Sequence, residues 1–153
     1  MKTVDQWLDD YNASHRNRIN KRLHWVCVPL IVFAVACALK RVPMGASPLN
    51  LTELLGLLAL AYYFRLSWRL GLGMTLVFGL LYALVRWADA QLGAWFLAAA
   101  AGIFVLAWIG QFIGHHYERA KPSFFKDLQY LLIGPLWLLA HVYERLRLPI
   151  RAA

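Results

Sequence analysis

The stretch Ala94–Glu118, AWFLAAAAGIFVLAWIGQFIGHHYE, decides the class of fold. Its first part, Ala94–Ile113, carries no charged residue and is about as long as the ~20 residues that an α-helix needs to cross a bilayer. Three similar apolar runs precede it in the chain, at Leu23–Leu39, Leu51–Phe64 and Leu70–Val85. The sequence therefore predicts an all-α integral membrane bundle with about four transmembrane helices.

Composition supports one membrane-embedded domain over residues 1–153. The hydrophobic fraction is 61% and the mean hydropathy is +0.51, whereas soluble domains are roughly 45–50% apolar. The formal net charge of +8 would suggest nucleic acid in a soluble protein. Here the basic residues lie between the apolar runs, where they set membrane topology, so we expect membrane lipid and no nucleic acid as a partner.

The distribution of charge predicts the topology. If the four runs cross and the last apolar run, Leu128–His141, does not, thirteen of the 16 lysines and arginines lie on one side and three on the other. If the last run also crosses, the division is ten against six. The positive-inside rule favours the first arrangement, with both termini in the cytoplasm. Because Gly134-Pro135 interrupts the last run, we expect a broken C-terminal segment that dips into the membrane or lies at its interface.

The N-terminal segment, TVDQWLDDYNA at residues 3–13, is polar and acidic with an apolar face. Trp7, Leu8 and Tyr11 share that face at helical spacing. This pattern predicts a short interfacial helix on the membrane surface.

The predicted topology gathers all five histidines of the chain at the cytoplasmic end of the bundle. Ionisable residues in membrane segments are functional candidates by default, and imidazole is a preferred ligand of zinc, iron, copper and nickel. The polar residues near these histidines are candidates to orient them. The histidines are His15, His24, His115, His116 and His141, and the polar neighbours are Gln111, Glu118, Asn17 and Asn20.

Helical geometry separates the two adjacent histidines. Gln111, His115 and Glu118 recur at i, i+4 and i+7 and therefore share a face. His116 is rotated by about 100° from His115, so two neighbours on a regular helix do not point at one metal.

His15 and His24 are nine residues apart. On one unbroken helix they would lie about 13 Å apart on opposite faces. If both belong to one site, the chain must bend between them, with Asn17 and Asn20 as cap or turn residues.

Three kinds of function fit these residues. One metal ion held by three or four histidines beside a lipid-lined bundle suits a substrate with a polar head and an acyl tail. A zinc-dependent lipid hydrolase would use the same ligands. A membrane protein that binds haem, or that serves as a scaffold without catalysis, is the third interpretation.

Three segments resemble signatures of the 2-hydroxy-fatty-acid dioxygenase family. They are HRNRINKRLHWVCVP (His15–Pro29), WIGQFIGHHYERAKP (Trp108–Pro122) and LLIGPLWLLAHVYE (Leu131–Glu144). The resemblance covers both ends of the chain, while about residues 40–100 match only in character. It implies an Fe(II)-dependent enzyme that uses O2 to convert a 2-hydroxy fatty acid into an acid one carbon shorter, with release of CO2.

The resemblance also implies roles for individual residues. The family's histidines map onto His15, His24 and His115, which would bind the iron. His141 stands where the family often has an acidic residue, and His116 is not a fixed family feature, so each is a candidate for a further ligand.

The remaining polar residues complete the expected site. Gln111 and Glu118 would orient ligand imidazoles through the second ring nitrogen. The carboxylate of the substrate would be attracted by Arg16, Lys21 and Lys121, although topology signalling alone also explains these three charges. We expect the active site to lie on the cytoplasmic side of a bacterial inner membrane.

Overall fold

The structure is a computed structural model that describes residues 2–118 and 124–150. Over these residues the chain is helical and contains no strand, which confirms the predicted all-α class. The elements are α1 (Val4–Ala13), α2 (Arg18–Lys40), α3 (Leu51–Leu66), α4 (Trp68–Leu92), the short 3-10 helix η1 (Gly93–Trp95), α5 (Phe96–Glu118) and α6 (Phe124–Arg145).

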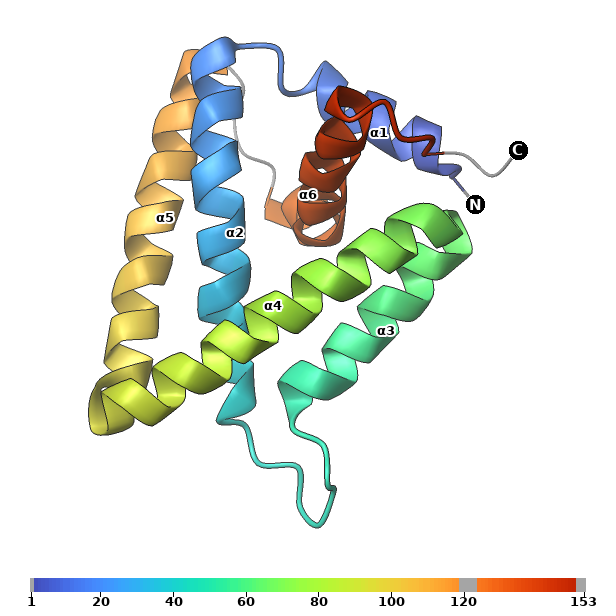
Figure 1. The fold of residues 1–153 in the computed structure, drawn as a ribbon. Coiled ribbons are helices and arrows are strands. Elements are labelled where there is room, and N and C mark those ends of the chain that lie inside the picture. Colours follow the sequence, from blue (N-terminus) through green and yellow to red (C-terminus); the bar gives the residue numbers. More distant parts are fainter. Residues whose placement is uncertain (1, 119–123, 151–153) are drawn as a thin grey trace.

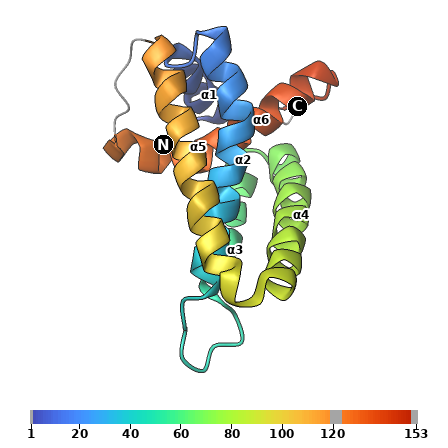
Figure 2. The same ribbon diagram turned by 90° about the vertical axis from the view of Figure 1, so that its left-hand side faces the viewer.

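The helices form two pairs with a further helix across one end. Helices α2 and α5 stand side by side along most of their length, and α3 and α4 form an antiparallel pair beside them (Figures 1 and 2). Helix α6 packs against α1, α2 and α4. The turn from α4 into α5 requires Gly93, whose φ of 51° is a conformation that glycine adopts without strain.

Two glycines of α5 allow α2 to approach closely. A Cβ atom placed on Gly110 would lie 2.5 Å from Cys27 Sγ, and one placed on Gly114 would lie 2.5 Å from Asn20 Oδ1. Side chains of α2 therefore occupy the space that side chains at these glycines would need. Small residues bring membrane helices together in the same way.

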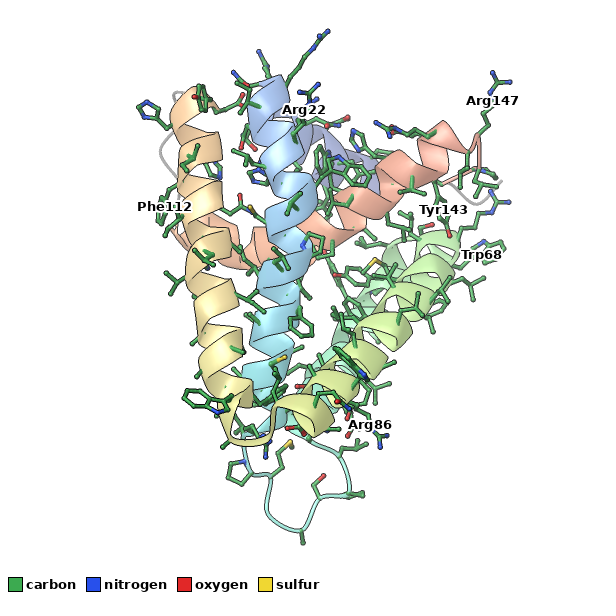
Figure 3. The ribbon with its side chains drawn as sticks, turned by 60° about the vertical axis from the view of Figure 1, so that its left-hand side comes forward. Arg22, Trp68, Arg86, Phe112, Tyr143 and Arg147 are labelled. Atoms are coloured by element: carbon green, nitrogen blue, oxygen red, sulfur yellow. The ribbon has the colours of Figure 1, made fainter. Side chains whose placement is uncertain are left out.

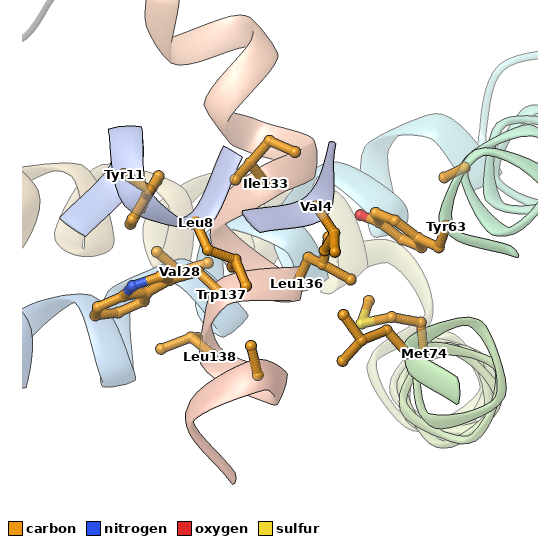
Figure 4. Packing of buried hydrophobic residues seen from close by; sticks show 13 residues of the cluster. Val4, Leu8, Tyr11, Val28, Tyr63, Met74, Ile133, Leu136, Trp137 and Leu138 are labelled. Atoms are coloured by element: carbon orange, nitrogen blue, oxygen red, sulfur yellow. The ribbon is translucent and has the colours of Figure 1, made fainter. Parts of the chain in front are cut away.

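The largest core cluster surrounds Trp137 of α6 (Figure 4). The apolar face of α1, with Val4, Leu8 and Tyr11, is buried in this cluster. The prediction of an N-terminal amphipathic helix is therefore confirmed, but its apolar side packs onto the protein and does not face a membrane surface.

The predicted break at Gly134-Pro135 is wrong, because α6 continues through both residues. Gly134 lies where three helices meet, since an added Cβ would be 3.3 Å from Tyr11 Oη and 3.4 Å from Val28 Cγ1. Pro135 has no N–H and so removes only one bond of the helix. Packing on both sides and a hydrogen bond of 2.7 Å from Tyr63 Oη to the carbonyl of Leu132 support the helix there.

Among the residues that the structure describes, two stretches are long and apolar enough to cross a membrane, Arg18–Lys40 and Trp68–Glu118. The second has 51 residues and contains α4, η1 and α5. Only 17% of its most apolar window is buried, so it is not the core of a soluble fold, and its exposed apolar side chains suit lipid. The structure thus suggests a membrane protein, and the count of four spans stays a prediction.

Charged side chains separate toward the two ends of the bundle. Arg22 and Arg147 lie at one end and Arg86 at the other (Figure 3), which is the division that the four-span topology requires. Asp89 lies past the end of the apolar run Leu70–Val85 but inside α4, and it forms ion pairs with Lys40 and Arg41. These ion pairs allow α4 to extend beyond the apolar run.

The glycine contact between α2 and α5 predicts opposite effects for the same substitution at two sites of α5. Gly114→Ala should destabilise the fold by about 1–3 kcal/mol, because the new methyl group overlaps Asn20. Gly102→Ala, where nothing lies within 4 Å of an added Cβ, should be neutral or stabilising by up to ~1 kcal/mol, as helix propensity dictates. Thermal unfolding in detergent measures both, and equal stability of the two variants would contradict the close approach.

Candidate metal centre

Three imidazoles meet at one end of the α2–α5 pair. His15 lies in the short segment between α1 and α2, His24 in the second turn of α2, and His115 in the last turn of α5. One ring nitrogen from each lies within 4.8 Å of the other two. The bend that the spacing of His15 and His24 requires is present, since α1 ends at Ala13 and α2 begins at Arg18.

Backbone carbonyls fix the tautomers of two of these rings. His15 Nδ1 lies 2.7 Å from the carbonyl oxygen of Tyr11, and His24 Nδ1 lies 2.9 Å from that of Asn20. A carbonyl can only accept, so each Nδ1 carries the proton and each Nε2 presents a lone pair. The two Nε2 atoms are 3.0 Å apart, and two lone pairs that face each other at this distance repel unless a cation lies beside both.

The chemistry of this donor set fits a metal ion. Burial lowers the pKa of His15 to about 4, so its imidazole is neutral near pH 7, which is the form that binds metals. Outer contacts hold the ligand rings of metal sites in orientation, and the carbonyls of Tyr11 and Asn20 serve that purpose here. The three histidines are therefore suited to hold a metal such as iron or zinc.

Aromatic rings hold His15 in place. Tyr11 stacks on its imidazole with ring centroids 4.1 Å apart and planes only 5° from parallel. Trp137 lies against Tyr11, with centroids 5.1 Å apart, and donates from Nε1 to Asn12 Oδ1 at 2.8 Å. The core of α1 and α6 thus determines the position of the first histidine.

A cavity of about 70 Å³ adjoins the imidazoles. Gln111 lines it, is 7% exposed, and its Oε1 accepts no hydrogen bond from the described residues. A buried amide oxygen without a partner is costly, so this atom is placed to meet a ligand in the cavity. The cavity is lined by Tyr11, His15, His24, Val28, Ile31, Trp108, Gln111, His115 and Leu131.

Glu118 holds the segment that carries His15. Its Oε1 accepts from the backbone N–H of Arg16 at 2.7 Å, and its Oε2 accepts from the N–H of Asn17 at 2.9 Å and from Asn20 Nδ2 at 3.0 Å. These hydrogen bonds go to donors beside His15 and not to an imidazole, so Glu118 acts on that ring through the backbone. Asn17 is the predicted N-cap of α2, whereas Asn20 lies inside the first turn of that helix.

The structure separates His116 and His141 from the three central histidines. His116 is exposed, as the helical spacing predicted. His141 lies against Trp137, with ring centroids 4.3 Å apart, and Trp137 in turn lies 6.0 Å from the ring of His15. Neither belongs to the cluster of ligand atoms, so the structure offers no support for either as a further ligand.

The three basic candidates have different positions. Arg16 is exposed, while Lys21 is half-buried and close enough for its charge to lower the pKa of His15. Lys121 lies outside the described residues.

Sequence reasoning missed the aromatic residues of the site. Tyr11 stands four residues before His15, and the sequence predicts it only as part of the apolar face of the N-terminal helix. Its helical spacing to His15 was the available signal, while Trp108 and Trp137 lie within apolar runs, where nothing distinguishes them from core residues.

The contacts of Glu118 predict a specific effect of Glu118→Gln. The amide can accept on one atom only, and its NH2 group would face donors that now bond to the carboxylate. We expect metal affinity to fall about 10–100-fold, as for other outer-contact substitutions, when measured by metal titration of purified protein. Glu144→Gln, at an exposed carboxylate of α6, is the matched control and should retain full affinity. Equal affinities would show that Glu118 does not position His15.

Comparison with known proteins identifies the family of the chain. Residues 1–146 match the family model described as 2-hydroxy-palmitic acid dioxygenase Mpo1-like. The chain is also similar to the 2-hydroxy-palmitic acid dioxygenase MPO1 of Saccharomyces cerevisiae, with 32% identity over 133 residues that cover 84% of this chain and 73% of the yeast protein. No solved structure matches the chain. The family match over nearly the whole chain, together with this relative, shows that the chain belongs to the Mpo1-like 2-hydroxy-palmitic acid dioxygenase family.

Proposed function

We propose that this chain is an Fe(II)-dependent dioxygenase that shortens 2-hydroxy fatty acids by one carbon. The overall reaction is R–CH(OH)–COOH plus O2 giving R–COOH, CO2 and H2O. The bond between C1 and C2 breaks, C2 is oxidised to the new carboxyl group, C1 leaves as CO2, and O2 is reduced. The reaction balances without a second organic substrate, because the hydroxy acid supplies all the electrons.

The observation that carries the proposal is the convergence of His15, His24 and His115. Three neutral imidazoles would hold one ferrous ion and leave positions for exogenous ligands. Ferrous iron bound there would supply the one-electron chemistry that allows O2 to react with an organic substrate. The family and the name of the yeast relative support this reaction class over others that the same ligands permit.

The chain's own residues would bind and orient the substrate. The amide of Gln111 is buried in the cavity beside the histidines and suits a hydrogen bond with the 2-hydroxyl or carboxyl group. The charge of Lys21 favours a carboxylate nearby. Tyr11, Ile31 and Trp108 line the cavity and exclude bulk water from the reacting carbons.

The alternatives make different predictions about the site. A cavity of about 70 Å³ is well below the ~300–1,000 Å³ of pockets that take larger ligands, and so does not suit a haem. A zinc hydrolase would use the same three histidines, so product analysis separates it, with a shortened acid and CO2 expected here and a cleaved ester or amide expected there.

The proposal places the reaction at a membrane. The substrate would enter from lipid, and charge counting orients the histidine end toward the cytoplasm of a bacterial inner membrane. That orientation stays a prediction.

Alanine substitutions test the ligand assignment. His15→Ala, His24→Ala and His115→Ala should each lose more iron affinity than the ~10–100-fold typical of outer-contact changes, and should abolish O2-dependent turnover of 2-hydroxypalmitic acid. His116→Ala and His141→Ala are the matched controls and should retain iron, because both side chains lie outside the cluster. Full iron content in His115→Ala would refute the assignment.

Removal of the buried amide should affect the substrate and leave iron bound. Gln111→Leu has similar volume but cannot hydrogen-bond, so we expect kcat/KM for 2-hydroxypalmitic acid to fall about 5–150-fold, the loss typical of a buried hydrogen-bond partner. Gln91→Leu, at an exposed position of α4, is the control and should match the parent protein. An unchanged kcat/KM in Gln111→Leu would exclude this amide from substrate binding.

A further inference from the structure

A second, much larger cavity lies beside the histidine site. It is a groove of about 980 Å³ between α2 and the α3–α4 pair, bounded at one end by α6, in the region where α4 crosses α2 in Figure 1. Ligand pockets typically measure about 300–1,000 Å³, so the groove is large enough for a lipid-sized molecule. Its lining is mainly leucine, valine, alanine and aromatic side chains.

The groove adjoins the histidine cavity directly. Leu131 of α6 lines both spaces. On α2, Val28 and Ile31 line the histidine cavity. Val32 and Val35, one helical turn further along α2, line the groove. Leu131 thus stands between the two spaces, and a molecule that extends past it would reach from the imidazoles into the apolar groove.

The groove runs along α2 and has polar side chains at the end far from the histidines. From His24 to Leu39, the last α2 residue in its lining, α2 rises about 22 Å at ~1.5 Å per residue. An extended chain of about 15 carbon–carbon bonds advances ~19 Å, because bonds of ~1.5 Å alternate in a zigzag. At the far end Tyr82 donates to Glu53 at 2.6 Å and accepts from Asn50 Nδ2 at 2.8 Å, and these polar groups oppose entry of a longer apolar chain.

We propose that this groove binds the acyl tail of a long-chain 2-hydroxy fatty acid whose carboxyl and hydroxyl groups lie at His15, His24 and His115. The inference rests on the proposed function for the identity of the head group. The shared wall at Leu131, the apolar lining and the matching length favour this occupant over a bilayer lipid, which would need no place beside the histidines.

The groove sets the position of the tail more than the affinity for it. Lipid around the protein already surrounds an acyl chain with apolar groups, so transfer into the groove changes its hydrophobic free energy little. Selectivity for chain length must then come from the polar end, where methylene groups beyond the matching length would meet Asn50, Tyr82 and Glu53. A side chain added inside the groove should therefore shift the preferred length.

Two glycines allow this test. Gly56 of α3 and Gly79 of α4 line the groove toward its polar end, and nothing lies within 4 Å of a Cβ placed on either. In Gly56→Leu and Gly79→Leu we expect turnover of 2-hydroxypalmitic acid to fall on the order of 10-fold or more, while turnover of 2-hydroxyoctanoic acid stays unchanged. Gly102→Leu is the matched control, because it also has free space at its Cβ but lies on α5 away from the groove. An unchanged length preference in both groove variants would overturn the inference.

Photolabelling separates this inference from the proposed function. The probe is 2-hydroxyhexadecanoic acid with a diazirine at its terminal carbon, bound to the full chain in detergent and mapped by mass spectrometry. Labels on α3 and α4 residues of the groove that 2-hydroxypalmitic acid competes away would support the tail site even if the protein turned over no hydroxy acid. Turnover combined with labels confined to the outer face of α5 would retain the proposed function and refute the groove.

Discussion

Helices α2 and α5 approach each other closely at Gly110 and Gly114, where Cys27 and Asn20 occupy the space beside the glycine backbone. This contact sets the register of the two helices. In that register the last turn of α5 lies beside the first turns of α2, so His115 meets His24. The hydrogen bonds from the segment before α2 to Glu118 and the cavity beside the imidazoles also depend on the separation of these two helices.

Much of the fold follows from the apolar runs in the sequence. Long uncharged segments predict α2, α3 and α5 to within a few residues, because lipid-facing helices need little else. The prediction of helix ends failed where it rested on one residue without the tertiary contacts which that residue makes. The apolar run Leu70–Val85 ends before Asp89, but α4 continues through this residue, whose carboxylate pairs with Lys40 and Arg41 from the end of α2. Pro135 suggested a break, but tertiary packing holds the helix through it.

Helical periodicity predicted part of the site. The contacts that depend on the path of the backbone could not be predicted from the sequence. The shared face of Gln111, His115 and Glu118 follows from spacing, and so does the bend before α2. The partners of Glu118 do not, because they are backbone N–H groups whose positions no side-chain pattern records. The stacking of Tyr11 on His15 likewise depends on how α1 docks on α6, which only the assembled structure shows.

The bond from Glu118 to the backbone of Arg16 joins residues 102 positions apart in the sequence. During synthesis, a chain that has not yet reached α5 contains His15 and His24 but neither the third imidazole nor the carboxylate that holds His15 in place. Loops of this length close late, after local helices have formed. A redox-active metal would therefore be held firmly only once the bundle is nearly complete, which limits its release and its reactions in partly folded protein.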